Sequence, residues 1–260
     1  MTNAILTASD VSYGYSSEHT VLRGISAAFE HGALCGIIGP NGCGKTTLLK
    51  LLSGELKPTS GHVLLGGRDT AAYPMREKAR RIAVVPQSSH MDFDMTALDV
   101  VLMGRQPYLR RFERETDNDI AIACNALERT DMLKYRDTPV TALSGGEMQR
   151  VIIARALAQQ TDVMLLDEPS ASLDLKHAAQ ILSLIRALTR EKSVCGVCVL
   201  HDLSLAGWFC DEIILMNNGE IYSSGSPADV LTFKAIRDVY GVESDIMRDG
   251  AHVRVLPRYE

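Results

Sequence analysis

The feature that most constrains this chain is a glycine-rich loop placed directly after a short apolar segment. The segment, Leu34–Ile38, carries no charge, which is typical of a strand buried in a parallel sheet. The loop has the form G-x-x-x-x-G-K-T, and residues 46–52 after it have the composition of a helix that ends at Ser53 and Gly54. A strand, a glycine loop and a helix in this order predict an α/β fold with a phosphate-binding loop.

The residue types in this loop suit a phosphate group. Glycine at Gly39, Gly42 and Gly44 lets backbone N–H groups turn toward an anion without a Cβ clash, and a helix N-terminus adds partial positive charge. Lys45 would reach the β- and γ-phosphates of a nucleotide, and the Thr46 hydroxyl would be a ligand of Mg²⁺. A chance match in an ordinary turn is the alternative, and the flanking strand and helix weigh against it. The predicted nucleotide-binding residues here are Gly39, Pro40, Asn41, Gly42, Cys43, Gly44, Lys45, Thr46 and Thr47.

A second glycine pair opens another predicted helix. The segment Leu143–Glu147 reads Leu-Ser-Gly-Gly-Glu, and residues 148–158 after it have helical composition. Ser144 and Glu147 have the spacing of a capping box, so one interpretation is a well-capped helix and nothing more. The double glycine favours phosphate binding, because it leaves backbone donors uncovered at the N-terminus of a helix. We therefore predict that Ser144, Gly145, Gly146 and Glu147 contact a nucleotide.

Two acidic residues follow a third apolar segment, 163–166. Pro169 cannot continue a strand, so Asp167 and Glu168 are predicted at the C-terminal end of that strand, where ligand sites lie in open α/β sheets. Asp167 would hold Mg²⁺ through its water shell, and Glu168 would orient or polarise the attacking water. The alternative is a solvated acidic pair at a strand end. It is disfavoured because a phosphate-binding loop needs an acidic partner of this kind.

Two further polar residues follow predicted strands. Gln87 comes after residues 82–86, and His201 comes after residues 197–200. A lone histidine is more often structural than catalytic, and Gln87 alone would mean little. Beside a phosphate-binding loop, His201 suits a contact with a γ-phosphate, and Gln87 suits Mg²⁺ or the attacking water. The predicted catalytic residues are Glu168, His201 and Gln87, and the predicted metal ligands are Thr46, Gln87 and Asp167.

Together these motifs resemble those of the ATP-binding cassette (ABC) ATPases, in the order that the family has them. The resemblance implies that Asp174 contacts the nucleotide and that an aromatic residue stacks on adenine. Tyr13 and Tyr15 both qualify, and the spacing to Val21 favours Tyr15. In the family's terms, the correspondences are Gly39–Thr46 with the Walker A loop, Gln87 with the Q-loop, Leu143–Glu147 with the signature, Val163–Asp167 with Walker B, Glu168 with the catalytic glutamate, Ser170–Asp174 with the D-loop and His201 with the switch histidine.

The resemblance also implies a fold and a mechanism. The fold would be that of a P-loop NTPase (RecA-like), with a mostly parallel sheet core, an N-terminal antiparallel β subdomain and an inserted α-helical subdomain. Residues 1–87 and 161–260 would form the core with the β subdomain, and residues 88–160 the helical subdomain. Two copies would meet head to tail as a homodimer, each ATP lying with its Mg²⁺ between the glycine loop of one copy and Ser144–Glu147 of the other.

A finer resemblance points to a group within the family. Residues 96–108, 173–177 and 201–206 resemble the ATPase subunits of importers for iron–siderophores, haem and cobalamin, although molybdate and tungstate importers share the pattern. Read without the family, Gly104 and Arg105 are an ordinary helix terminus. The resemblance implies a separate transmembrane permease, indirectly an extracytoplasmic solute-binding protein, and a peripheral place on the cytoplasmic face of the inner membrane.

Other classes fit the sequence less well. DNA-acting ABC ATPases carry a long coiled-coil insertion and ribosome-acting ones usually join two cassettes, whereas this chain has neither feature. The signature and the tandem acids disfavour a small-molecule kinase. With 27 Lys and Arg against 32 Asp and Glu, the net charge of −5 gives no footprint for a nucleic acid. Neither a signal peptide nor an apolar stretch of membrane-spanning length is recognised.

The six cysteines are expected to be reduced thiols. Cys195 and Cys198 are three residues apart in a predicted strand, so they would point to opposite faces of the sheet. Cys43 lies inside the glycine loop. Its oxidation or alkylation is therefore predicted to block ATP binding.

Overall fold

The structure, a computed structural model, describes residues 4–16, 19–87, 94–171 and 173–258, and the chain packs into two units. One unit comprises Met1–Tyr73 and Ile185–Glu260, and the other comprises Pro74–Leu184. This division by packing does not coincide with the subdomain limits predicted at residues 88 and 160, which stay a prediction. The strands and helices confirm the predicted α/β class.

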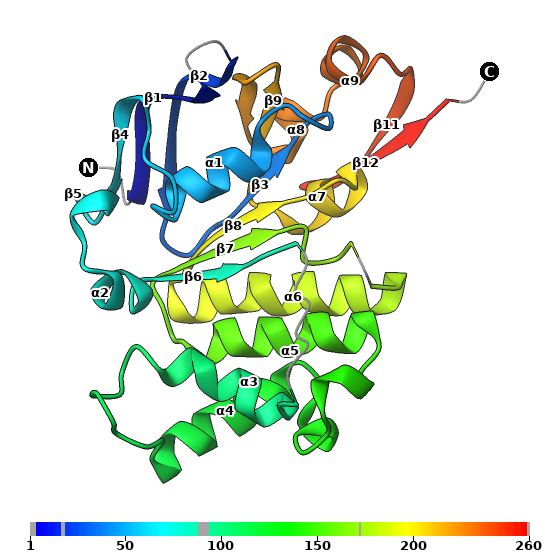
Figure 1. The fold of residues 1–260 in the computed structure, drawn as a ribbon. Helices are drawn as coiled ribbons and strands as arrows, with labels where there is room; N and C mark the ends of the chain where they lie inside the picture. Colours follow the sequence, from blue (N-terminus) through cyan, green and yellow to red (C-terminus); the bar gives the residue numbers. More distant parts are fainter. Residues whose placement is uncertain (1–3, 17–18, 88–93, 172, 259–260) are drawn as a thin grey trace. The chain divides into compact units, whose positions relative to one another are not determined.

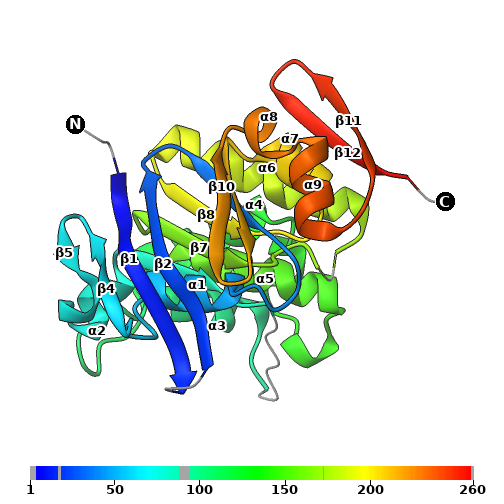
Figure 2. The same cartoon turned by 90° about the horizontal axis from the view of Figure 1, so that it is seen from above.

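The first unit contains the predicted N-terminal antiparallel sheet (Figures 1 and 2). Asp10 of β1 has a positive φ of 50°. A Cβ added to Gly61 of β4 would come 2.3 Å from the carbonyl oxygen of Asp10. The strand β4 approaches β1 so closely there that only glycine fits. The sheet has the order β2-β1-β4-β5, with β1 Ala4–Ser16, β2 His19–Glu30, β4 Ser60–Leu65 and β5 Arg68–Asp69, followed by the short 3₁₀ turn η1 at Thr70–Ala72.

A second group of strands in this unit carries the glycine loop. The central strand β3 (Leu34–Ile38) runs parallel to β8 (Cys195–Val199) and to β9 (Glu212–Asn217), and β10 (Glu220–Gly225) pairs antiparallel with β9. Every residue of β3 and β8 is buried, as expected for central parallel strands. Asn218 has φ 47° and Gly219 has φ 82°, so they join β9 to β10 in a two-residue hairpin.

The remaining elements of the first unit are the helices α1, α7, α8 and α9 and a C-terminal hairpin. The strand β12 of the hairpin contacts α7 and α8, and β11 contacts α9. Figure 2 shows α9 beside this hairpin. The bounds are α1 Lys45–Leu52, α7 Leu203–Phe209, α8 Pro227–Val230, α9 Phe233–Tyr240, β11 Ser244–Asp249 and β12 His252–Pro257.

The second unit joins a pair of parallel strands to a group of helices. Val85 of β6 lies opposite Leu166 of β7, so the two strands end side by side. The helices α3, α4 and α5 pack on one another. The bounds are α2 Met75–Ala79, β6 Ile82–Val85, α3 Ala97–Leu102, η2 Met103–Arg105, α4 Asp117–Arg129, η3 Leu133–Tyr135, η4 Val140–Ala142, α5 Gly145–Ala158 and β7 Val163–Asp167, and α6 Leu175–Lys192 runs through the division between the units.

Each of the three packed helices starts at a capping box. Thr96, Thr116 and Ser144 each accept a hydrogen bond from the backbone three residues on, and the acid at that position accepts one in return. The helix α4 begins directly after Thr116 and ends at Arg129. The first residues of the predicted helical region, 88–93, lie outside the described part of the chain. Among the helices that are described, none is both long and apolar enough to cross a membrane.

A buried ion pair connects the helices of this group. Arg105 is 5% exposed, and its Nε donates to Oδ1 of Asp119 at 2.9 Å while Nη1 donates to the carbonyl oxygen of Ala158 at 2.8 Å. A Cβ added to Gly104 would come 2.4 Å from the carbonyl oxygen of Arg155, so glycine is required where η2 approaches α5. Gly104 and Arg105 are therefore more than a helix terminus, because they tie α3, α4 and α5 together.

Arg105→Ala is expected to lower the free energy of unfolding by about 3 kcal/mol, because it leaves a buried carboxylate without its partner. Hydrogen bonds from Thr116 and Arg105 lower the pKa of Asp119 to about 2. The stabilisation is therefore complete above about pH 4, the unfolded pKa, and is lost as the pH falls toward 2. Urea unfolding at pH 7 measures the loss.

The matched control is Arg136→Ala, which removes an exposed arginine paired with Asp137 at 3.0 Å. Its free energy of unfolding is expected to stay close to that of wild type, because an exposed ion pair contributes little. Equal losses in the two variants would contradict the structural role of Arg105.

Candidate nucleotide-binding site

The glycine loop leaves β3 and leads directly into α1. Gly39 has φ 152° and Gly44 has φ 102°. An added Cβ at Gly39 would come 2.4 Å from the carbonyl oxygen of Met216, and one at Gly44 would come 2.5 Å from Cδ2 of Leu22. Gly44 is the N-cap of α1 and has no side chain with which to cover the first turn of the helix. The loop therefore wraps tightly and leaves its backbone as the surface that meets a ligand.

The side chain of Lys45 lies within this loop. It is 6% exposed, and its ammonium group donates to the carbonyl oxygens of Gly39 at 2.8 Å and Pro40 at 3.0 Å. The positive charge is thus held at the loop's own backbone, where an anion bound by the loop would meet it. This is the position that the sequence predicted for a phosphate contact.

The side chain of Cys43 is buried, although the residue lies in the glycine loop. The residue is 4% exposed, and its Sγ lies 2.7 Å from where a Cβ of Gly39 would be. Burial raises the pKa of the thiol, and the nearby Lys45 lowers it by a smaller amount. The thiolate is the reactive form, so the thiol of Cys43 should react slowly, and the blocking of ATP binding by its modification stays a prediction. The backbone of Cys43 belongs to the loop, but its side chain packs inward.

We therefore expect iodoacetamide at pH 7 to label Cys43 more slowly than the half-buried Cys124, since the Cys43 side chain is buried and its raised pKa leaves less of the reactive thiolate. Peptide mass spectrometry after brief exposure measures both rates. Equal labelling of the two thiols would mean that the loop opens and exposes Cys43.

The aromatic candidates lie beside the loop. Tyr15 is 63% exposed, and its hydroxyl is 3.5 Å from Oγ1 of Thr47 in α1. The Tyr13 ring meets the Tyr15 ring edge-on at 5.1 Å between centroids. The exposed face of Tyr15 is therefore available for stacking, which accords with the preference for Tyr15 over Tyr13.

In the second unit, Gln87 and Glu168 are hydrogen-bonded. Gln87 follows β6 and Glu168 follows β7, and Nε2 of Gln87 donates to Oε2 of Glu168 at 2.7 Å. Glu168 has a φ of +50°, which is uncommon for a residue with a side chain. Such backbone strain is found at functional sites. Asp167, the last residue of β7, is 8% exposed.

The second glycine pair forms the N-terminus of α5. The Ser144 hydroxyl donates to Oε2 of Glu147 at 2.8 Å, and the Ser144 backbone N–H donates to the same oxygen at 2.9 Å. Bonds from the backbone and then the hydroxyl of Ser144 lower the pKa of Glu147. Within the described chain, a Cβ added to Gly145 would meet no atom within 4 Å. The capping box is therefore present, and the chain's own packing gives no reason for a glycine at Gly145.

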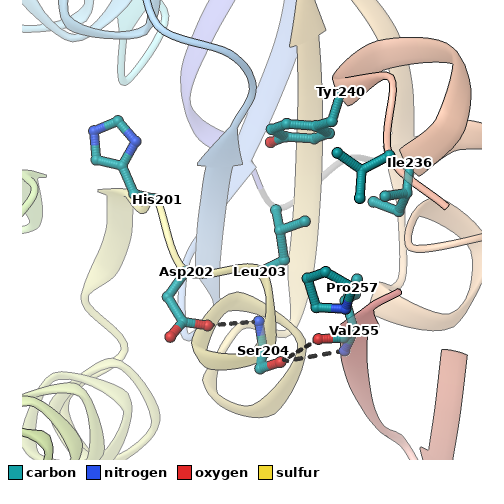
Figure 3. Close-up of a pocket in the computed structure, with 9 residues that line it drawn as sticks. His201, Asp202, Leu203, Ser204, Ile236, Tyr240, Val255 and Pro257 are labelled. Carbon is teal, nitrogen blue, oxygen red and sulfur yellow. Dashed lines mark hydrogen bonds between the residues drawn. The ribbon is translucent and has the colours of Figure 1, made fainter. Parts of the chain in front are cut away.

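Two other predicted residues have local partners. Asp174 accepts hydrogen bonds at 2.8 Å from the backbone N–H of His177 and 2.8 Å from its Nδ1, so it caps α6. The bond from that backbone N–H is the main cause of its lowered pKa. Ser172 of the predicted D-loop lies outside the described residues. His201 follows β8 and is exposed, and Figure 3 shows its imidazole pointing away from Tyr240 and Ile236.

The predicted residues therefore form two groups, one in each unit. The first unit holds the glycine loop, Tyr15 and His201, and the second holds Gln87, Ser144–Glu147, Asp167, Glu168 and Asp174. A joint site of the two groups stays a prediction. Sequence reasoning missed the pair of Arg105 with Asp119 and the contact between α7 and β12 beside His201, because both join residues that are separated in the sequence.

Comparison with known proteins identifies the family. The model of the ABC transporter family matches residues 22–171. The chain is 42% identical over 231 residues to the cobalamin import ATP-binding protein BtuD of Halobacterium salinarum, covering 89% of this chain and 58% of that protein. It is 42% identical to the hemin import ATP-binding protein HmuV of Rhodococcus jostii, covering 92% and 81%. It is 37% identical to the ferric enterobactin transport ATP-binding protein FepC of Escherichia coli, covering 95% and 90%.

Solved structures agree with this assignment. The ADP conformation of an ATP-binding cassette of an ABC transporter matches with a TM-score of 0.81 at 26% identity, over 92% of this chain and 99% of that one. A dimeric post-hydrolysis cassette bound to ADP and Pi matches with a TM-score of 0.75 at 28% identity, over 85% and 97%.

The fold and the glycine loop thus define a P-loop nucleotide-binding protein. The chain belongs to the ABC transporter family, and two of the relatives that it matches are named cobalamin and hemin import ATP-binding proteins. It spans 58% of the length of the cobalamin relative.

Proposed function

We propose that the chain is the ATP-hydrolysing subunit of an ABC importer and drives transport through a separate membrane permease. The observation that carries the proposal is the Gln87–Glu168 pair at the ends of two adjacent parallel strands, in a chain that belongs to the ABC family. A carboxylate there, held in a strained backbone and oriented by an amide, suits a residue that activates water.

The chemistry is assigned to residues of this chain. Glu168 accepts a proton from the attacking water or orients it, and Gln87 fixes the direction of the Glu168 carboxylate. Lys45 and the loop backbone bind the β- and γ-phosphates, His201 contacts the γ-phosphate, and Tyr15 stacks on adenine.

Mg²⁺ is assigned to Thr46, Gln87 and Asp167. Their hydroxyl, amide and carboxylate oxygens are the donors that this ion prefers, and the chain presents them at the glycine loop and at the ends of β6 and β7. When bound, Mg²⁺ neutralises charge on the β- and γ-phosphate oxygens.

The active form is proposed to be a head-to-tail homodimer. Ser144–Glu147 of one copy would contact the ATP held by the glycine loop of the other. Two observations support this: a Cβ at Gly145 meets nothing in the described chain, and a cassette similar to this chain is dimeric when bound to ADP and Pi. Asp174, at the start of α6, is assigned to the same interface.

The cargo is proposed to be an iron–siderophore, haem or cobalamin, because relatives along most of the chain are named for cobalamin, hemin and ferric enterobactin. The chain would act at the cytoplasmic face of the inner membrane, with permease subunits as direct partners and a solute-binding protein as an indirect one.

Capture from native membranes tests the transport role. Tagged Glu168→Gln chain is purified with ATP and Mg²⁺, and its partners are identified by mass spectrometry, with Lys45→Ala as the control that should not hold nucleotide. A polytopic permease with Glu168→Gln but not with Lys45→Ala is the expected result. Recovery of ribosomes, DNA or only soluble partners would contradict a role in transport.

A further inference from the structure

A cavity of about 400 Å³ lies next to His201, between the start of α7, the helix α9 and the C-terminal hairpin (Figure 3). Its lining is mostly apolar and includes Leu203, Ile236, Tyr240 and Val255. The segment that carries His201 is therefore separated from α9 by open space. Contacts that hold this segment in place lie at the other wall, where α7 meets β12.

Ser204 joins the two elements across that wall. Its hydroxyl donates to the carbonyl oxygen of Val255 at 3.2 Å and accepts a hydrogen bond from the Val255 backbone N–H at 3.2 Å. Figure 3 shows both bonds. The Ser204 side chain thus satisfies both backbone groups of Val255, as the backbone of a neighbouring strand would. The two residues are 51 positions apart in the sequence.

The contact continues along α7. A Cβ added to Gly207 would come 2.2 Å from the carbonyl oxygen of Val253, so α7 lies directly on the backbone of β12. One turn away from Ser204, the Trp208 ring stacks on His252 at 4.3 Å between centroids, and the Arg254 guanidinium lies 4.9 Å from the Trp208 ring. The contacts with the hairpin therefore fix both the distance of α7 from β12 and the rotation of α7 about its own axis.

The link from Ser204 back to His201 is short and rigid. Asp202 caps α7, because Oδ1 accepts from the backbone N–H of Ser204 at 2.8 Å and of Leu205 at 2.9 Å. His201 is the residue immediately before this cap. A movement of the first turn of α7 would therefore move the backbone of His201 with it.

We propose that the C-terminal hairpin positions His201 and that Ser204 is the positioning residue. This inference rests on the proposed function, in which His201 contacts the γ-phosphate of ATP. Hydrolysis needs the imidazole at a fixed place, whereas nucleotide affinity comes mainly from the glycine loop. Loss of the Ser204 hydroxyl should therefore slow turnover and leave ATP binding nearly unchanged.

The test compares Ser204→Ala with Ser204→Thr, which restores a hydroxyl. Ser204→Ala is expected to lower kcat about fivefold, the size expected from about 1 kcal/mol of a lost hydrogen bond, with KM within about twofold of wild type. Ser204→Thr should recover most of the rate. Ser26→Ala is the matched control, because Ser26 also binds a backbone N–H, that of Asp10 at 3.0 Å, but in the N-terminal sheet. It should turn over at the wild-type rate.

Trp208 provides a local probe, because it is the one tryptophan of the chain. Its fluorescence should change in Ser204→Ala and remain as in wild type in Ser26→Ala. His252→Ala removes the ring on which Trp208 stacks and leaves Ser204 in place. It should also lower kcat without raising KM, and it serves as the second variant where Ser204→Ala does not fold.

A double-variant comparison separates positioning from general destabilisation. If Ser204 acts through His201, adding Ser204→Ala to His201→Ala should cause no further loss of rate. An unchanged kcat in Ser204→Ala, or an equal loss with and without His201, would overturn the inference while His201→Ala itself remains slow. Wild-type turnover in His201→Ala would instead remove the role of His201 from the proposed function, and this inference with it.

Discussion

Glu168→Gln should reduce ATP hydrolysis by about 100-fold or more, the scale of a lost general base, and leave ATP binding intact. The structure makes this variant informative because Nε2 of Gln87 donates to Oε2 of Glu168 at 2.7 Å. An amide oxygen at the same place still accepts that bond. The geometry is thus retained, and only the ability to take a proton is removed.

Phosphate release at saturating Mg-ATP measures the rate, and fluorescence of a labelled nucleotide measures affinity. Glu128→Gln, an exposed change of the same kind on α4, should behave as wild type. Near-normal hydrolysis by Glu168→Gln would remove Glu168 from the chemistry, and some other group would have to activate the water.

Lys45→Ala is expected to weaken ATP binding about 100-fold, which corresponds to about 2.7 kcal/mol. Lys45 is buried, and its ammonium group is held by the carbonyl oxygens of Gly39 and Pro40, so its charge lies within the loop rather than in solvent. Removing it takes away the cation that would face the phosphates. Titration with a fluorescent ATP analogue measures the change in Kd.

The control is Lys50→Ala in the same helix. Lys50 is 41% exposed along its side chain and lies 3.7 Å from Glu55, an arrangement that contributes little. Its ATP affinity should equal that of wild type. If both lysines mattered equally, the effect would reflect net charge and not the geometry of the loop.

Local sequence signals predicted the parts of the fold that depend on neighbouring residues. The uncharged segment Leu34–Ile38 became a fully buried strand, and Ser144 with Glu147 formed the expected capping box. In each case the side chains of a few consecutive residues determine the backbone, so no knowledge of the rest of the molecule is needed.

Contacts between residues that are distant in the sequence could not be predicted from local sequence patterns. Read without the family, Arg105 was only a residue at a helix terminus, because nothing near it reveals that Asp119 and Ala158 meet it in the core. Ser204 and Val255 are equally remote from one another. The inward packing of Cys43 depends on its tertiary surroundings, so the loop motif alone does not reveal it.

The most direct test of the account is the mass of the Glu168→Gln chain in solution, measured by light scattering after size-exclusion chromatography. With ATP and Mg²⁺ the account predicts twice the 28.4 kDa of the single chain, and with ADP the single mass. Adding Ser144→Arg should abolish the ATP-dependent dimer but preserve ATP binding, because Ser144 is exposed at the start of α5. A chain that binds ATP and stays monomeric in every condition would contradict the proposal that two copies close around the nucleotide.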